Sequence, residues 1–294
     1  MRTTNPGSSV NIDCDGVEIF AHVSGSGTPV LLLHGYPETR AMWTRVASVL
    51  AERHTVVAAD LRGYGDSAKP AGEQYAKREM AADQWRLMRS LGHERFAVVG
   101  HDRGGRVGHR LALDHPEAVA AIAVLDIVPT LHMYEHVDLE MATSYFHWFF
   151  LSRSDGLPEA LISAAPRAWL ESRFRGRVVR DGAITPAAFA EYLRCFDEAT
   201  IRASCADYRA AATIDLEHDR DDRTAGRRVS APLLALWGSQ SYVGRTFDVV
   251  DVWSDFADAA SGMPIDADHY LAEEAPIETA AALSAFLDDE NVQW

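Results

Sequence analysis

Residues 98–116 read VVGHDRGGRVGHRLALDHP and combine an apolar run, a glycine-rich turn and a helical pattern. A strand that enters a helix through such a tight turn is typical of a nucleophile elbow, which lifts its central residue above the edge of a sheet. The central residue here is Asp102. Gly100 and Gly104 leave room for the close backbone approach that this turn requires. The stretch therefore predicts a carboxylate presented at the end of a strand.

The segments around this turn alternate between apolar strands and amphipathic helices. TPVLLLHGYP (28–37) and TVVAAD (55–60) lie upstream, and VAAIAVLDI (119–127) lies downstream. Unbroken apolar strands joined by helices are typical of a parallel sheet that is covered on both faces. The fold class predicted is thus α/β, with a mostly parallel sheet.

The alternation stops for about a hundred residues, a length too great for a structureless loop in a compact domain. We therefore expect a helical cap over residues 129–229, inserted between a first core part (1–128) and a second (230–294). The mixed charges of DLEHDRDDRTAGRR (215–228) predict a solvated connector rather than a metal site. Residues 1–9 are polar and predicted to lie outside the regular elements.

Composition limits the partners of the chain. Among 294 residues, 43 acidic and 28 basic side chains give a net charge of −15, which argues against binding to nucleic acid or to an anionic membrane. The three cysteines show no CxxC spacing, and no apolar run reaches the ~18 residues of a membrane span. We expect a cytoplasmic protein without metal or cofactor, and a homodimer is compatible with this expectation.

The polar residues at other strand ends suggest how an aspartate could act. An ionised Asp102 suits displacement of a leaving group from saturated carbon, which gives an ester bound to the enzyme. His269, in DADHYLAEEAP, is placed to activate the water that cleaves this ester, with Asp126 as its carboxylate partner. The backbone N–H groups of Tyr36 and Arg103 are candidates for the oxyanion hole.

The chain resembles the haloacetate (fluoroacetate) dehalogenases of the α/β-hydrolase superfamily. The resemblance covers nearly the whole chain through LLLHGYPETRAMWTRVA, ADLRGYGDS, VGHDRGGRVGHRLALDHP, LDIVPT, HWFFL, CADYRAAATIDLEHD and HYLAEEAP, with GHDRGGR as the most specific element. It implies cofactor-free hydrolysis of a small anionic haloacid such as fluoroacetate or chloroacetate to glycolate and halide.

The resemblance also implies roles for five further side chains. Arg103 and Arg106 would hold the substrate carboxylate, consistent with their spacing of three on one helix face and with the paired hydrogen bonds of a guanidinium fork. The departing halide would lie among neutral donors of the cap, namely His147, Trp148 and Tyr208.

One stretch departs from the family pattern. Where these dehalogenases carry a further cap tryptophan, ESRFRGRVV (171–179) has none, and Arg177 is the nearest match. Trp169 lies upstream. The preferred halogen and the largest acid accepted are left open by this difference. Three alternatives also stay open: an epoxide hydrolase, a haloalkane dehalogenase, and a binding protein of this fold without turnover.

Overall fold

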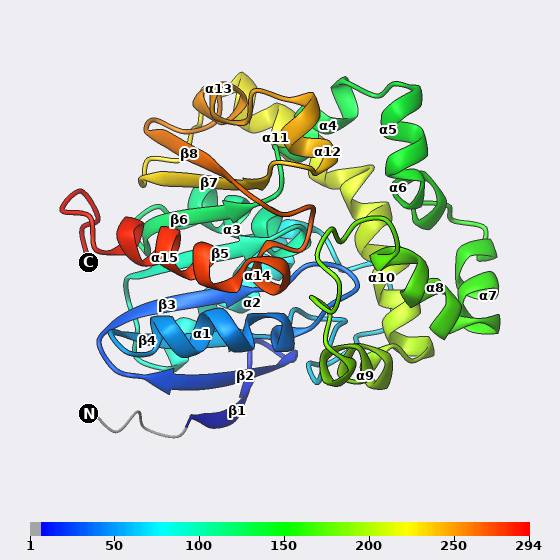
Figure 1. Ribbon diagram of the computed structural model, residues 1–294, viewed down its shortest axis with the longest axis horizontal. Helices are drawn as coiled ribbons and strands as arrows, with labels where there is room; N and C mark the ends of the chain where they lie inside the picture. The colour runs from blue at the N-terminus through cyan, green and yellow to red at the C-terminus, as the bar shows by residue number, and fades with distance from the viewer. Residues whose placement is uncertain (1–6) are drawn as a thin grey trace.

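The computed structural model describes residues 7–294 and is built around an eight-stranded sheet (Figure 1). The spatial order is β1-β2-β4-β3-β5-β6-β7-β8. The pairs β1–β2 and β2–β4 are antiparallel, and every other neighbouring pair is parallel. The strands are β1 (Ser8–Asp13), β2 (Glu18–Gly25), β3 (Thr28–Leu33), β4 (His54–Ala59), β5 (Phe96–His101), β6 (Val119–Leu125), β7 (Leu233–Gly238) and β8 (Ala260–Ile265).

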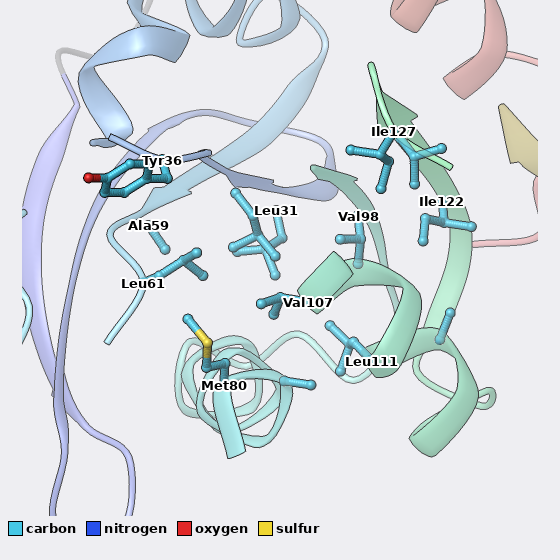
Figure 2. Close-up of a cluster of buried hydrophobic side chains, with 14 of the residues drawn as sticks. Leu31, Tyr36, Ala59, Leu61, Met80, Val98, Val107, Leu111, Ile122 and Ile127 are labelled. Carbon is cyan, nitrogen blue, oxygen red and sulfur yellow. The ribbon is translucent and has the colours of Figure 1, made fainter. Parts of the chain in front are cut away.

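Both faces of the sheet are buried, as the unbroken apolar strands predict. In β3, Val30 and Leu32 belong to one hydrophobic cluster, whereas Leu31 and Leu33 belong to another. The first cluster is completed by α1 (Thr44–Leu50) and α15 (Pro276–Leu287), and the second by α2 (Lys77–Ser90), α3 (Arg103–Asp114) and α13 (Val249–Ser254). Figure 2 shows the second cluster, in which strand residues Leu31, Val98 and Ile122 face helix residues Met80, Val107 and Leu111.

Residues 130–224, all of them described, contain eight helices and no strand. Figure 1 shows α5 to α10 gathered to one side of the sheet, while α4 and α11 lie nearer to it. This helical segment lies between β6 and β7, within the residues 129–229 for which the sequence predicts a cap. Its helices are α4 (Thr130–Glu135), α5 (Leu139–Ser144), α6 (Phe146–Leu151), α7 (Leu157–Ala164), α8 (Pro166–Phe174), α9 (Pro186–Cys195), α10 (Glu198–Ala211) and α11 (Ile214–Thr224).

Three further short helices follow the strands β3, β7 and β8 along the chain. They are a 3-10 helix (Arg40–Trp43), α12 (Tyr242–Thr246) and α14 (Leu271–Glu274).

Two expectations from the sequence need correction. Ser8 and Ser9, expected to lie outside the regular elements, pair with β2 as part of the edge strand β1; residues 1–6 lie outside the described residues. The charged run at 215–228 is exposed along most of its length, as expected, but residues 215–224 belong to the helix α11, and Asp215 and Asp222 are buried against Lys77 and Arg110. Within residues 7–294, no group of His, Cys, Asp and Glu side chains is arranged to hold a metal ion.

The three cysteines, Cys14, Cys195 and Cys205, are all buried and free. None of the helices in the described part of the chain is long and apolar enough to cross a membrane.

Candidate active site

The turn after β5 has the tight geometry of an elbow. Asp102 adopts φ 43° and ψ −112° between β5 and α3. A Cβ atom on Gly100 would lie 2.4 Å from the carbonyl oxygen of Gly104, and one on Gly104 would lie 2.3 Å from that of Leu33. No real Cβ atom tolerates such distances, so both glycines are required by the turn, as predicted.

The carboxylate of Asp102 is buried, with only 4% of the residue exposed. Its Oδ2 accepts a hydrogen bond of 3.2 Å from the backbone N–H of Tyr36. Its side chain accepts no hydrogen bond from the first turn of α3, although the helix dipole still favours its charge. Burial raises the pKa of Asp102, but the neighbouring imidazoles of His269 and His101, followed by the guanidinium groups of Arg103 and Arg106, outweigh burial, so the pKa is lowered. The nucleophile candidate is therefore ionised at neutral pH.

His269 and Asp126, which are 143 residues apart, meet in the structure. The imidazole Nδ1 of His269 lies 2.7 Å from Oδ2 of Asp126. The other oxygen of Asp126 accepts hydrogen bonds from the Ser241 hydroxyl (2.6 Å) and from the Gly238 N–H (3.0 Å). Burial raises the pKa of Asp126 to about 6, and these two bonds oppose that rise. The arrangement fixes one tautomer of His269 and leaves its Nε2 free to act as a base.

Ser241 was not identified from the sequence. It lies in LWGSQSYVG, a segment without any acid, and it acts by holding the acid of the preceding strand. The only sequence signal was its position directly after the strand that neighbours Asp126.

His269 is held as a neutral base by its surroundings. Burial, followed by the positive charge of Arg177, keeps the pKa of His269 well below its ordinary value. The ring of His101 lies 4.7 Å from that of His269, and its Nε2 is 2.9 Å from the His269 carbonyl oxygen. The Nδ1 of His101 contacts Glu38 at 3.0 Å, so the imidazole of His101 fixes the backbone of the base.

Arg103 is less free than its sequence position suggests. Its Nε donates to Asp207 at 2.9 Å, and its Nη2 also donates to the same carboxylate, with both side chains fully buried. Only Nη1 lacks a partner among residues 7–294. The expected two-pronged grip on a substrate carboxylate is thus reduced to one free nitrogen at Arg103, and the helix α10 that carries Asp207 orients it.

Arg106 is also partly held. Its Nη1 donates to the carbonyl oxygen of Val128 (3.1 Å) and to the Thr130 hydroxyl (2.9 Å), while Nε has no partner within the described chain. Its guanidinium carbon lies 4.7 Å from the centre of the Trp148 ring. Arg106 thus contacts Trp148 of the cap, and the charge of Asp102 acts on its guanidinium.

The three halide-binding candidates of the cap form one cluster with these arginines. The ring of Tyr208 lies 5.7 Å from that of His147 and 6.3 Å from that of Trp148, and the Arg103 guanidinium stacks on it at 4.3 Å. The Tyr208 hydroxyl, the Trp148 Nε1 and the His147 Nδ1 are all buried and find no partner in the described part of the chain. Burial keeps the pKa of His147 well below its usual value, so its ring is neutral.

The region of the missing tryptophan is filled in part by other side chains. Trp169 reaches Tyr36, whose hydroxyl accepts a hydrogen bond of 2.5 Å from the indole N–H. Arg177 lies with its guanidinium carbon 4.6 Å from the ring centre of Tyr145. The guanidinium of Arg177 thus takes the sequence position nearest to the cap tryptophan that the resemblance implies.

Comparison with known families fits this geometry. The model of the alpha/beta hydrolase fold matches residues 28–276. The chain belongs to the α/β-hydrolase family. The expectation from the sequence is confirmed at this level, and the eight-stranded sheet agrees with it.

Individual α/β hydrolases resemble the chain over almost its full length. A fluoroacetate dehalogenase from Burkholderia sp. is 45% identical, with 95% of this chain and 93% of that protein covered. A soluble epoxide hydrolase from Corynebacterium sp. (strain C12) is 32% identical, covering 90% and 93%. The crystal structure of ALR0039, a proposed alpha/beta hydrolase from Nostoc sp. PCC 7120, is 49% identical with a TM-score of 0.94, covering 96% and 98%. The chain is therefore similar in sequence both to a dehalogenase and to an epoxide hydrolase.

Proposed function

We propose that this α/β hydrolase is a haloacetate dehalogenase that converts fluoroacetate or chloroacetate to glycolate and halide. One observation carries the proposal: five buried polar atoms without partners in the described chain lie on side chains that form one cluster with Arg103, the residue directly after Asp102. They are Arg103 Nη1, Arg106 Nε, His147 Nδ1, Trp148 Nε1 and the Tyr208 hydroxyl. A buried donor without a partner costs about 1–3 kcal/mol, so such a cluster favours an anionic ligand that supplies the missing acceptors.

The proposed reaction has two covalent steps. In the first, a carboxylate oxygen of Asp102 bonds to the α-carbon, and the carbon–halogen bond breaks with its electron pair on the halide. In the second, His269 takes a proton from water, and the hydroxide attacks the carbonyl carbon of the ester. The Tyr36 N–H, already 3.2 Å from Oδ2 of Asp102, supports the oxyanion. The C–O bond of the ester breaks, the proton of the added hydroxide passes to the departing alkoxide, and glycolate leaves with the carboxylate of Asp102 restored. His269 releases its proton to solvent.

The arginines argue for an acid rather than a neutral substrate. Arg106 is buried beside Asp102, and burial lowers its pKa although the guanidinium remains charged. A substrate carboxylate would accept from the free nitrogens of Arg103 and Arg106 and compensate their desolvation. An uncharged haloalkane would leave that cost in place.

Epoxide hydrolysis is a second candidate. Two buried tyrosines of the cap, Tyr145 and Tyr208, lie on either side of His147, each with its ring centre 5.7 Å from the imidazole. Two phenols near an aspartate could protonate an epoxide oxygen. The similarity to the soluble epoxide hydrolase adds to this candidate, whereas the buried arginine pair speaks against it.

A substrate panel separates the candidates. We expect halide release from fluoroacetate and chloroacetate, and a kcat/KM for chloroacetamide at least about thirtyfold lower than for chloroacetate, because a lost charge-assisted contact costs roughly 2 kcal/mol or more. 1-Chlorobutane and styrene oxide should not react measurably. Turnover of styrene oxide alone would replace the proposal by the second candidate, and equal rates for the acid and the amide would contradict the arginine site.

The halide donors give a prediction that depends on the halogen. Fluoride leaves with concentrated charge and needs donors in the transition state, whereas bromide needs fewer. We expect Tyr208→Phe and His147→Ala each to lower kcat for fluoroacetate at least about tenfold, or ~1.4 kcal/mol of barrier, and kcat for bromoacetate much less.

Tyr75→Phe is a matched control for the tyrosine variant. It removes a buried phenol whose hydroxyl, unlike that of Tyr208, has a partner, the carbonyl oxygen of Pro70 at 2.7 Å. Steady-state kinetics with both halides should show no halogen-dependent change in this control. Equal losses for fluoroacetate and bromoacetate in the Tyr208 and His147 variants would instead mean that both residues only pack the cap.

We also propose a cytoplasmic location. Three buried thiols remain free, which fits a reducing compartment.

A further inference from the structure

A cleft of about 260 Å³ lies between the cap and the core, beside the buried active site. Its walls come from the region of α5 and α6, from the end of α8, and from α12. Four of the side chains that line it are arginines (Arg173, Arg175, Arg177 and Arg245), and only one is an acid (Asp268). In a chain of net charge −15, this local excess of positive charge attracts small anions to one place on the surface.

Arg177 differs from the two arginines next to the nucleophile. Arg103 is bound by the carboxylate of Asp207, and Arg106 donates to Thr130. The half-buried side chain of Arg177 makes no ion pair and no side-chain hydrogen bond within residues 7–294. Its guanidinium stacks on the ring of Tyr145, and all of its N–H groups remain available to donate hydrogen bonds. Unlike Arg103 and Arg106, Arg177 therefore has a guanidinium with both prongs free to bind a carboxylate.

Arg177 also connects the cleft with the reacting groups. The ring of Tyr145, on which it stacks, is itself stacked on His147 at an angle of 25°. Asp268, which also lines the cleft, directly precedes His269. After burial, Arg177 is the largest influence that lowers the pKa of His269, and the charges of Asp102 and Asp126 act on Arg177 in return. The guanidinium thus lies within electrostatic reach of the nucleophile from the side of the cleft.

We propose that Arg177 binds a second carboxylate of the substrate, so that the preferred class is the 2-halo dicarboxylic acids such as 2-chlorosuccinate. This inference rests on the proposed function. With the first carboxylate at Arg103 and Arg106 and the α-carbon at Asp102, a substituent on that carbon must extend toward another wall. The cleft supplies that wall, and a guanidinium fork matches a carboxylate in shape and charge.

The chemistry is unchanged for this substrate. A carboxylate oxygen of Asp102 bonds to C2 while the C2–Cl bond breaks, and chloride leaves with the electron pair. Water then cleaves the ester with His269 as base. The products are 2-hydroxysuccinate, chloride and one proton for each water consumed.

Kinetics on matched acids test the inference. We expect kcat/KM for 2-chlorosuccinate to exceed that for 2-chlorobutyrate, which has an apolar end in place of the second carboxylate, at least about tenfold. Arg177→Gln and Arg177→Trp should each reduce this ratio to near one. Arg167→Gln, which removes an exposed arginine of α8 paired with Glu171, should keep the ratio of the parent protein.

Binding of unreactive acids provides a measurement that does not need turnover. By calorimetry, succinate should bind at least about tenfold more tightly than butyrate, and the difference should vanish in Arg177→Gln but persist in Arg167→Gln. If chloroacetate is turned over but 2-chlorosuccinate is not preferred to 2-chlorobutyrate, nor succinate to butyrate, the role of Arg177 is overturned and the proposed function is retained. Loss of chloroacetate turnover in the parent protein would overturn the proposed function, while the succinate measurement would still decide the second carboxylate site.

Discussion

Replacing Asp102 by alanine is expected to abolish halide release, whereas replacing His269 by asparagine should stop the reaction halfway. Without the carboxylate no ester forms. Without the imidazole, Asp102 still attacks the α-carbon, but no base activates the water. Intact-protein mass spectrometry of His269→Asn with chloroacetate should therefore show one carboxymethyl group per chain, together with one equivalent of chloride.

The double variant Asp102→Ala/His269→Asn is the control for this experiment. It should carry no adduct if the ester forms on Asp102, and an adduct in it would assign the alkylation to another side chain. A single turnover of the parent protein in ¹⁸O-water adds an independent measurement. The label should enter the carboxylate of Asp102 and not the first glycolate released, because hydroxide attacks the carbonyl carbon of the ester. Label in the first glycolate would mean that water displaces the halide directly.

The sheet could be predicted from the sequence because its strands are apolar on both faces. Runs such as TPVLLL allow almost no other placement in a chain of this size. The edge strand β1 escaped prediction because SSVNID has too few apolar residues to mark a strand, and its backbone pairing with β2 keeps it in place. A strand is predicted from the apolar residues that it buries, and the exposed edge strand β1 buries few of its side chains.

The catalytic candidates could be predicted because two of them lie directly after a strand of the sheet, and His269 lies in the loop that follows β8. Asp102 follows β5 and Asp126 follows β6, and parallel strands bring such positions to one edge. Their partners could not be predicted, since they depend on how the cap docks. Asp207 is 104 residues from Arg103, and nothing in CADYRAA indicates that its aspartate is buried against two cations.

The same reason explains the two buried aspartates of the charged run. The ion pairs of Asp215 and Asp222 are made with Lys77 and Arg110, which belong to helices of the core. A charged side chain of such a segment stays solvated only if no complementary charge covers it. In this protein the interface between α11 and the core covers these two aspartates, while most of the run stays exposed.

Asp207→Asn is expected to lower the free energy of unfolding by about 3–5 kcal/mol at pH 7, the usual cost of removing one partner of a buried ion pair. Asp207 binds Arg103, Lys77 and the Tyr64 hydroxyl, the last at 2.7 Å. Burial opposes its ionisation, but Arg103 and Lys77 hold the pKa of Asp207 below its ordinary value. A lowered pKa contributes stability above the unfolded-state pKa and loses it as the pH falls through the folded-state pKa. At pH 7 the contribution is therefore complete.

Asp258→Asn is a matched control, because Asp258 forms an ion pair with Arg228 (3.0 Å) while 59% of its side chain is exposed. Denaturant unfolding should give a loss below about 1 kcal/mol for this control. Asp207→Asn should also lower kcat/KM for chloroacetate, since the carboxylate that orients Arg103 beside the nucleophile is gone. If both variants unfold at the same denaturant concentration, Asp207 does not hold the cap to the core. If stability falls while kcat/KM stays unchanged, Arg103 does not contact the substrate, and its pairing with Asp207 serves only the docking of α10.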